Sequence, residues 1–167
     1  MKSRLLFLAS AATMSDDGVY RYDLSRQLSM MGERTILFVG LNPSTADALK
    51  DDPTVRREIA FSRAWGFDWY LKGNLYAYRS TNPKVLLKIS DPVGPANRDA
   101  LERMVDRSEL IVAAWGCNPL TPAAKFNAVW ILNLEKTRCF GINQDGTPQH
   151  PLYLPKTSTL VRMDGRR

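Results

Sequence analysis

Polar side chains stand at the ends of several apolar segments of this 167-residue chain, and they could do chemistry there. The first are Asn42 and Ser44, an amide and a hydroxyl in a turn directly after the apolar run 36–39. Pro43 lacks an N–H group and holds Asn42 in an extended shape, so the turn is rigid. A strand with an unbroken apolar sequence is buried on both faces, and ligands bind at the carboxyl ends of such strands in open α/β sheets. The turn is therefore a candidate binding site, although an ordinary strand-to-helix turn capped by Asn42 has the same pattern.

Further polar groups follow the later apolar segments. Asn74 lies at the start of the second segment and Arg79 at its end, Trp115 and Gly116 end the third, and His150 lies in a loop after the fourth. The carboxyl ends of parallel strands lie at one edge of a sheet, so these groups can share one crevice. His150 is the only histidine, so any imidazole chemistry must use it. Two plainer interpretations stay open: His150 as a surface residue, and Trp115-Gly116 as core packing.

The carboxylates Asp47, Asp51 and Asp52 are a candidate metal site, but capping of a helix that begins at Pro53 explains them better. The chain contains no phosphate-cradling glycine loop, no G-x-S-x-G elbow, no H-E-x-x-H pair and no C-x-x-C pair. The sequence therefore indicates no metal and no cofactor.

The elements that position these groups alternate from residue 35 onward. Alternating strands and helices predict an α/β fold, a three-layer αβα sandwich whose central sheet is mostly parallel and has about four strands. Residues 4–9 and 18–24 are expected to add an N-terminal β-hairpin that turns at Asp17-Gly18. The expected core strands are 36–39, 73–80, 109–115 and 138–142, and the expected helices begin near residues 53, 82, 95 and 121.

Composition bounds the class of protein. A length of 167 residues and 44% hydrophobic residues suit a single domain, with a hairpin elaboration at 1–34, a core at 35–155 and a basic tail at 156–167. The net charge of +6 permits a nucleic acid or phosphate partner without requiring one. Two cysteines outside any C-x-x-C pair suit a reducing cytoplasm, and no apolar stretch is long enough to span a membrane. We therefore expect a cytoplasmic protein.

Four short segments carry recognisable motifs: 40–44, 73–81, 110–116 and 149–152. In this order they resemble the water-activating G-x-[DN]-P-x motif, the second strand, the third strand and the H-P-S loop of the uracil-DNA glycosylase superfamily, and the Asn form of the first resembles the mismatch-specific branch.

A second resemblance covers nearly the whole chain. It is to an uncharacterised bacterial and phage domain family with the motifs L-N-P-S-T-A-D, D-P-T-x-R-R, N-L-x-A-Y-R, D-P-x-G and H-P-L-Y, and it names no activity.

The glycosylase resemblance implies that the protein binds a flipped pyrimidine and hydrolyses its N-glycosidic bond. Asn42 would position a water beside the sugar C1′, and His150 would donate to a carbonyl of the departing base. Asn74 would read the pyrimidine edge, with an aromatic side chain, Tyr76 or Trp115, against the flipped base. The residues so implicated are Asn42 and His150 as catalytic, and Gly40, Pro43, Ser44, Asn74, Tyr76, Arg79, Trp115, Gly116, Pro151, Leu152 and Tyr153 as substrate-binding.

Two departures from the glycosylase pattern refine this expectation. Ser44 stands where the uracil-specific branch has a bulky Tyr, which implies a roomier pocket that suits 5-modified bases. Leu152 replaces the usual Ser after His-Pro, which weakens the expected phosphate contact, although Leu152 or Tyr153 could wedge into the base stack.

Enzyme activity itself stays open at the level of sequence. One alternative is a binding module that has lost catalysis and senses nucleotides or modified DNA. Another is an enzyme that acts on free nucleotides or nucleosides. All three hypotheses expect DNA or a nucleotide as partner, and the sequence indicates no particular protein partner.

Overall fold

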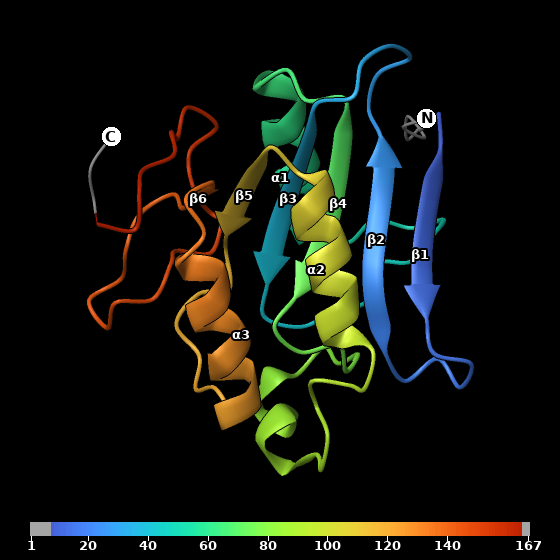
Figure 1. The fold of residues 1–167 in the computed structure, drawn as a ribbon, viewed down its shortest axis with the longest axis vertical. Coiled ribbons are helices and arrows are strands. Elements are labelled where there is room, and N and C mark those ends of the chain that lie inside the picture. Colours follow the sequence, from blue (N-terminus) through green and yellow to red (C-terminus); the bar gives the residue numbers. More distant parts are fainter. Residues whose placement is uncertain (1–7, 165–167) are drawn as a thin grey trace.

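The computed structural model describes residues 8–164, and Figure 1 shows one mixed sheet with helices packed on both faces. Its six strands lie in the order β1-β2-β4-β3-β5-β6. The strands are β1 (Ser10–Met14), β2 (Arg21–Gln27), β3 (Thr35–Gly40), β4 (Trp69–Asn74), β5 (Leu110–Ala113) and β6 (Thr137–Arg138).

The N-terminal hairpin belongs to this sheet, so the prediction of about four strands was wrong. β4, β3, β5 and β6 are parallel neighbours, whereas β2 pairs antiparallel with both β1 and β4. The predicted turn at Asp17-Gly18 is confirmed: the Gly18 N–H donates to the carbonyl of Ser15 at 2.9 Å, and Gly18 has a φ of 71°. The hairpin strands begin later than predicted, at residues 10 and 21, and residues 4–7 of the first predicted strand lie outside the described part of the chain.

The four helices begin close to where the sequence predicted them. They are α1 (Pro53–Ala64), the 3-10 helix η1 (Pro83–Lys88), α2 (Asn97–Arg107) and α3 (Pro122–Leu132). Three of them start with proline after a capping side chain, because proline suits the first helical turn and a side-chain oxygen satisfies a free backbone N–H. The caps are Asp52, Asn82 and Thr121, which accept from the N–H groups of Val55, Lys84 and Ala124.

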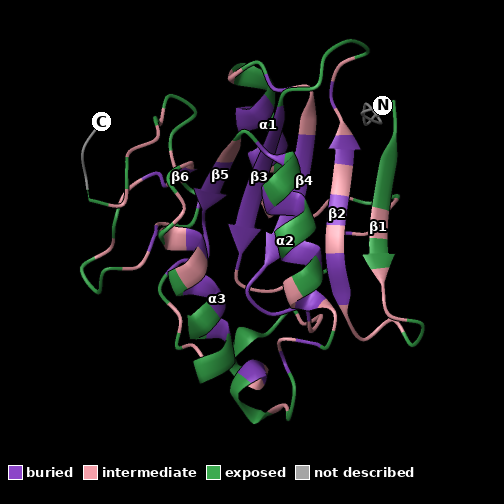
Figure 2. Ribbon diagram, in the orientation of Figure 1, coloured by how far each residue is buried: buried purple, intermediate pink, exposed green. Residues whose placement is uncertain are grey.

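β3 is buried along its whole length, as its apolar sequence predicted. Leu37 and Val39 pack in the cluster formed with α2 and α3, whereas Ile36 and Phe38 pack in the cluster that contains residues of α1. Figure 2 shows the same arrangement, with buried residues concentrated in the central strands. The site below therefore sits on a rigid, doubly covered strand.

β4 differs most from its prediction, because it spans Trp69–Asn74 rather than 73–80. The β-favouring pair Trp69-Tyr70 enters the sheet directly after α1, since Gly66 ends that helix with a φ of 75°. Asn74 is consequently the last residue of its strand, whereas the prediction placed it near the strand's start. It lies opposite Gly40 in the parallel register, at the carboxyl edge of the sheet.

The C-terminal strand also differs from the sequence interpretation. β6 contains two residues, Thr137 and Arg138, instead of the expected 138–142. Val161 forms an antiparallel bridge with Cys139 through two backbone hydrogen bonds of 2.8 and 2.9 Å. Within residues 8–164, no helix combines the length and apolar character needed to cross a bilayer.

Candidate functional site

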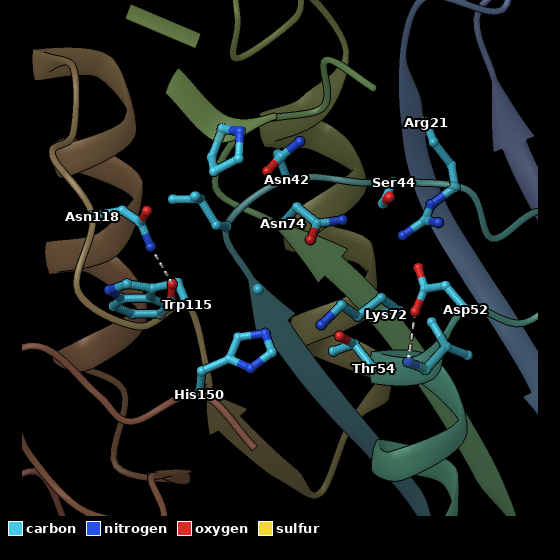
Figure 3. Close-up of a pocket in the computed structure, with 14 residues that line it drawn as sticks. Arg21, Asn42, Ser44, Asp52, Thr54, Lys72, Asn74, Trp115, Asn118 and His150 are labelled. Carbon is cyan, nitrogen blue, oxygen red and sulfur yellow. Dashed lines mark hydrogen bonds between the residues drawn. The ribbon is translucent and has the colours of Figure 1, made fainter. Parts of the chain in front are cut away.

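A cavity of about 200 Å³ opens at the carboxyl ends of β3 and β4, between the N-terminus of α1 and the His150 loop. Figure 3 shows side chains from these separate segments around it. Six of the predicted catalytic and substrate-binding residues line this cavity: Gly40, Asn42, Ser44, Asn74, Trp115 and His150.

The Asn42 amide is held in one orientation by backbone carbonyls. Its Nδ2 donates to the carbonyl of Pro43 at 3.0 Å and to that of Ser80 at 2.9 Å. Among the described residues, no donor reaches its Oδ1, so Asn42 does not cap the following segment. The oxygen is left as an oriented acceptor for a group in the cavity.

The His150 ring is turned toward the cavity although the residue lies in an exposed loop (Figure 3). Desolvation by the cavity walls, followed by the nearby charge of Lys72, lowers its pKa to about 4, with Asp52 opposing in part. The ring is therefore neutral at pH 7. Because the backbone N–H of Leu152 donates to Nδ1 at 3.3 Å, the ring proton is assigned to Nε2, which makes Nε2 a donor.

Asn74 carries an unsatisfied acceptor at the cavity floor. The residue is 2% exposed, and its Oδ1 has no hydrogen-bond partner in the described chain. Its backbone carbonyl accepts from Nδ2 of Asn97 at 3.0 Å, which fixes the backbone at the end of β4. A buried orphan oxygen is costly unless a ligand or water satisfies it, so this atom marks a binding position.

Gly40 leaves the space that this floor requires. A Cβ atom at position 40 would lie 3.0 Å from Asn74 Oδ1 and 2.7 Å from Lys72 Nζ. Its φ is not in the left-handed region, so the requirement is for space and not for backbone freedom. Any side chain here would fill the floor of the cavity.

Sequence reasoning missed the charged floor of the cavity. Lys72 Nζ donates to Glu58 Oε1 at 2.7 Å, and the Tyr70 hydroxyl donates to Glu58 Oε2 at 2.6 Å. All three residues are buried. Burial and the Glu58 carboxylate raise the pKa of Tyr70 well above its usual value. The available signal was Lys72 itself, a charged residue inside the strand sequence W-Y-L-K-G-N. It was missed because the predicted strand began at residue 73, after Lys72.

A second missed group is Arg21 at the start of β2. Its guanidinium is buried and donates from Nη1 to the carbonyl of Ala46 at 2.8 Å, whereas Nε has no partner in the part of the chain that the structure describes. Burial lowers the pKa of Arg21. Asp52 faces the same cavity while capping α1, which confirms its predicted structural role. The remaining lining residues are Leu41, Thr54, Val55, Pro83 and Asn118.

Several predicted binding residues lie outside the cavity lining. Tyr76 is fully buried, and its hydroxyl accepts from the N–H of Thr121 at 2.7 Å, so it cannot stack on a ligand. Arg79 donates to the carbonyl of Gly18 at 3.2 Å and supports the hairpin turn. Trp115, 2% exposed, is the aromatic residue that lines the cavity.

The remaining predicted residues surround the His150 loop and the Asn42 turn. Gly116 adopts a φ of 72°, and a Cβ there would lie 3.4 Å from the Cβ of His150. Pro43 and Pro151 are buried supports, Leu152 is half-buried, and Tyr153 is 93% exposed. These residues shape the two loops without lining the cavity.

A family model described as "Protein of unknown function (DUF1643)" matches residues 21–152. The chain belongs to this DUF1643 family. The match confirms the resemblance to an uncharacterised domain family, and it begins at Arg21 and ends just after His150, so it contains every residue that lines the cavity. No curated protein and no solved structure gives a match to the chain.

The cavity of this DUF1643 protein combines groups with complementary hydrogen-bonding roles. It offers two oriented acceptors, the side-chain oxygens of Asn42 and Asn74, and two donors, the neutral His150 ring and the Lys72 ammonium. A flat heterocycle that carries both carbonyl and N–H groups matches such a set.

Proposed function

We propose that the protein binds a flipped pyrimidine in DNA, 5-modified bases included, and hydrolyses its N-glycosidic bond. The observation that carries this proposal is that Asn42, Asn74 and His150, from three distant segments, border one cavity. Its volume of about 200 Å³ corresponds to roughly seven water molecules at about 30 Å³ each, which is room for a single heterocyclic ring. The resemblance of the four motifs to the uracil-DNA glycosylase superfamily supports the same proposal.

Asn42 positions the water in this proposal. Its Nδ2 is engaged with two carbonyls, so Oδ1 accepts from a water and directs the water oxygen toward C1′. The bond between C1′ and the ring nitrogen breaks, its electron pair leaves with the base, and the water oxygen bonds to C1′. The water gives up one proton, and the released base takes up one. A neutral amide is a weak base, so the rate depends strongly on the leaving group.

His150 donates a hydrogen bond from Nε2 to a carbonyl oxygen of the departing base. The lowered pKa supports this role, because the ring stays neutral and keeps one fixed tautomer from about pH 5 upward. Hydrogen-bond donors aimed at developing negative charge are among the largest contributions to enzymatic rate.

The partner in this proposal is DNA. The net charge of +6 favours a polyanion, and Tyr153, in the same loop as His150, is 93% exposed and available to enter a base stack. Ser44 in place of a bulky residue leaves space beside the base, which favours pyrimidines with a 5-substituent.

The test is a cleavage assay on single- and double-stranded oligonucleotides that carry uracil, mismatched pyrimidines or 5-modified pyrimidines, with abasic sites as the readout. We expect base release that falls about 10²-fold in Asn42→Ala and in His150→Ala. Asn133→Ala, at the distant end of α3, is the control and should retain the parent activity.

Two results would replace the proposal. Base binding without release, or both variants as active as the parent, would favour a binding module without this chemistry. Competition by mononucleotides but not by DNA would favour an enzyme that acts on free nucleotides.

A further inference from the structure

The Lys72 ammonium reaches the cavity with most of its hydrogen-bonding capacity unused. Its described partner is Glu58 Oε1, at 2.7 Å, whereas an ammonium group has three protons to donate. Lys72 lines the cavity, and Figure 3 shows its side chain reaching into it. Two of its N–H bonds therefore have no partner among the described residues and can donate to a ligand in the cavity.

The position of Lys72 is set by groups that lie beneath the cavity. Glu58 is fully buried in α1 and receives hydrogen bonds from both Lys72 and Tyr70, so its carboxylate is held from two sides. A buried ion pair of this kind is weak evidence for stability, because desolvation offsets much of the attraction. Stability alone therefore does not explain an ammonium group at this position, and a role in ligand binding does.

Lys72 shares the cavity floor with the acceptor that has no partner. Nζ of Lys72 and Oδ1 of Asn74 lie 2.7 and 3.0 Å from the same point, the place a Cβ of residue 40 would occupy. Figure 3 shows the ammonium pointing into the space between the Asn74 amide and the His150 ring. A base seated against Asn74 would therefore contact the positive charge.

We propose that Lys72, held by Glu58 and Tyr70, supplies the positive charge that stabilises the departing base. This inference rests on the proposed glycosidic function and adds a catalytic residue to it. When the bond to C1′ breaks, the electron pair spreads to the ring carbonyl oxygens, and Lys72 Nζ–H donates to one of them. Lys72 keeps its protons, and the base takes its proton from water after release. His150 provides a dipole, and Lys72 provides the charge.

The inference also narrows the substrate class. With the C4 substituent of the base toward Lys72, the C4 carbonyl of uracil or thymine accepts a hydrogen bond, whereas the C4 amino group of cytosine would direct its own N–H bonds at the ammonium. In this orientation the cavity should select bases of the uracil and thymine type and reject the cytosine type.

The first experiment measures charge stabilisation without catalysis. The free base 5-fluorouracil is the probe, and ultraviolet difference spectra over a pH series report deprotonation of its ring N–H when bound. A cation within a few ångströms should lower the pKa of that N–H by about one to three in the parent protein. The double variant Glu58→Gln/Lys72→Met, which removes both charges and leaves neither unpaired, should abolish this shift.

The second experiment measures the same effect in catalysis. Loss of an electrostatic stabiliser should slow release of uracil from an oligonucleotide about 10²–10³-fold in the double variant. Release of 5-fluorouracil should fall less, because its anion needs less stabilisation. Glu58→Gln alone keeps the ammonium and is the matched control, so its rate should stay well above that of the double variant.

The outcomes separate the two proposals. One contrary result is that the parent protein releases both bases and the double variant releases them at the parent rate. Another is that the double variant releases them more slowly by the same factor for uracil and 5-fluorouracil. Either result would overturn the role of Lys72 and leave the glycosidic function standing. Neither binding nor release by the parent would overturn the function, and this inference with it. If the double variant does not fold, an unshifted pKa of 5-fluorouracil bound to the parent protein is by itself sufficient to reject Lys72.

Discussion

The two edges of the central sheet both carry polar groups, but these groups are exposed at one edge and buried at the other. At the amino edge, Arg34 before β3 and Glu109 before β5 form an ion pair of 2.7 Å, and both side chains are about half exposed. At the carboxyl edge, Lys72 and Glu58 form an ion pair of the same length, with both side chains buried. The two ion pairs therefore have the same length, but one is exposed to water and the other is buried beside the cavity.

The partners around the two pairs show what the difference means. At the amino edge, Asp68 accepts from the Ser29 hydroxyl and from the backbone N–H of Arg34, and these hydrogen bonds lower its pKa. At the carboxyl edge, the side-chain oxygen of Asn74 has no hydrogen-bond partner among residues 8–164. Satisfied polar groups in solvent tie loops together, whereas buried charge beside an unsatisfied acceptor is typical of a binding site.

The largest expected effect comes from breaking the buried pair on one side. Glu58→Ala leaves the Lys72 ammonium without its anion and Tyr70 without its acceptor, so the free energy of unfolding should fall by about 3–5 kcal/mol. Urea denaturation measures the loss. Glu109→Ala at the opposite edge is the matched control. Similar losses for the two variants would show that burial does not distinguish the edges.

The next effect concerns the single histidine, whose ring protons can be followed by NMR without assignment of other residues. We expect a pKa of about 4 for His150 in the folded protein, and a higher value in Glu58→Gln/Lys72→Met, because the Lys72 charge is lost. The value should stay below 6.5, since desolvation is the larger cause. A pKa near 6.5 in the parent protein would contradict the orientation of the ring toward the cavity.

The same titration determines the direction of pH dependence. The folded pKa of His150 lies below the unfolded value of 6.5, so the unfolded chain takes up its proton first as the pH falls. The contribution of the neutral ring to stability is complete above about pH 6.5 and is lost between about pH 6.5 and 4. His150→Gln should remove this part of the acid destabilisation.

The smallest effect is expected at the exposed pair. A double-mutant cycle with Arg34→Met and Glu109→Gln should give a coupling free energy below about 1 kcal/mol that decreases with added salt. Chemical denaturation at low and high ionic strength measures it. A coupling as large as that of the buried pair, or one insensitive to salt, would contradict the comparison.

Local sequence signals predicted the elements that depend on neighbouring residues. Asp52-Pro53 and Thr121-Pro122 each mark a helix start, because capping and the proline φ act within one turn. The apolar run within β3 predicted a buried strand. The start of β4 was missed by four residues, since strand limits depend on pairing with β2 and β3, which lie far away in the chain.

Some residues of the candidate site could be identified from local sequence signals, and others only from the tertiary structure. The motif around Asn42 and the single histidine identified both residues from sequence, because their residue types are distinctive. Tyr76 looked equally suitable, but it packs in the core with its hydroxyl on Thr121. Lys72 and Glu58 carried no motif, and their pairing joins a strand to a helix.

The sequence by itself determined a mixed α/β chain with a rigid Asn-Pro turn after a buried strand, since periodicity and turn chemistry are properties of adjacent residues. Only the tertiary structure decided which polar groups meet. It brought a buried ammonium, an unsatisfied amide oxygen and a neutral imidazole to one cavity, because burial and electrostatic environment arise from residues that pack together across the fold and not from their order in the chain.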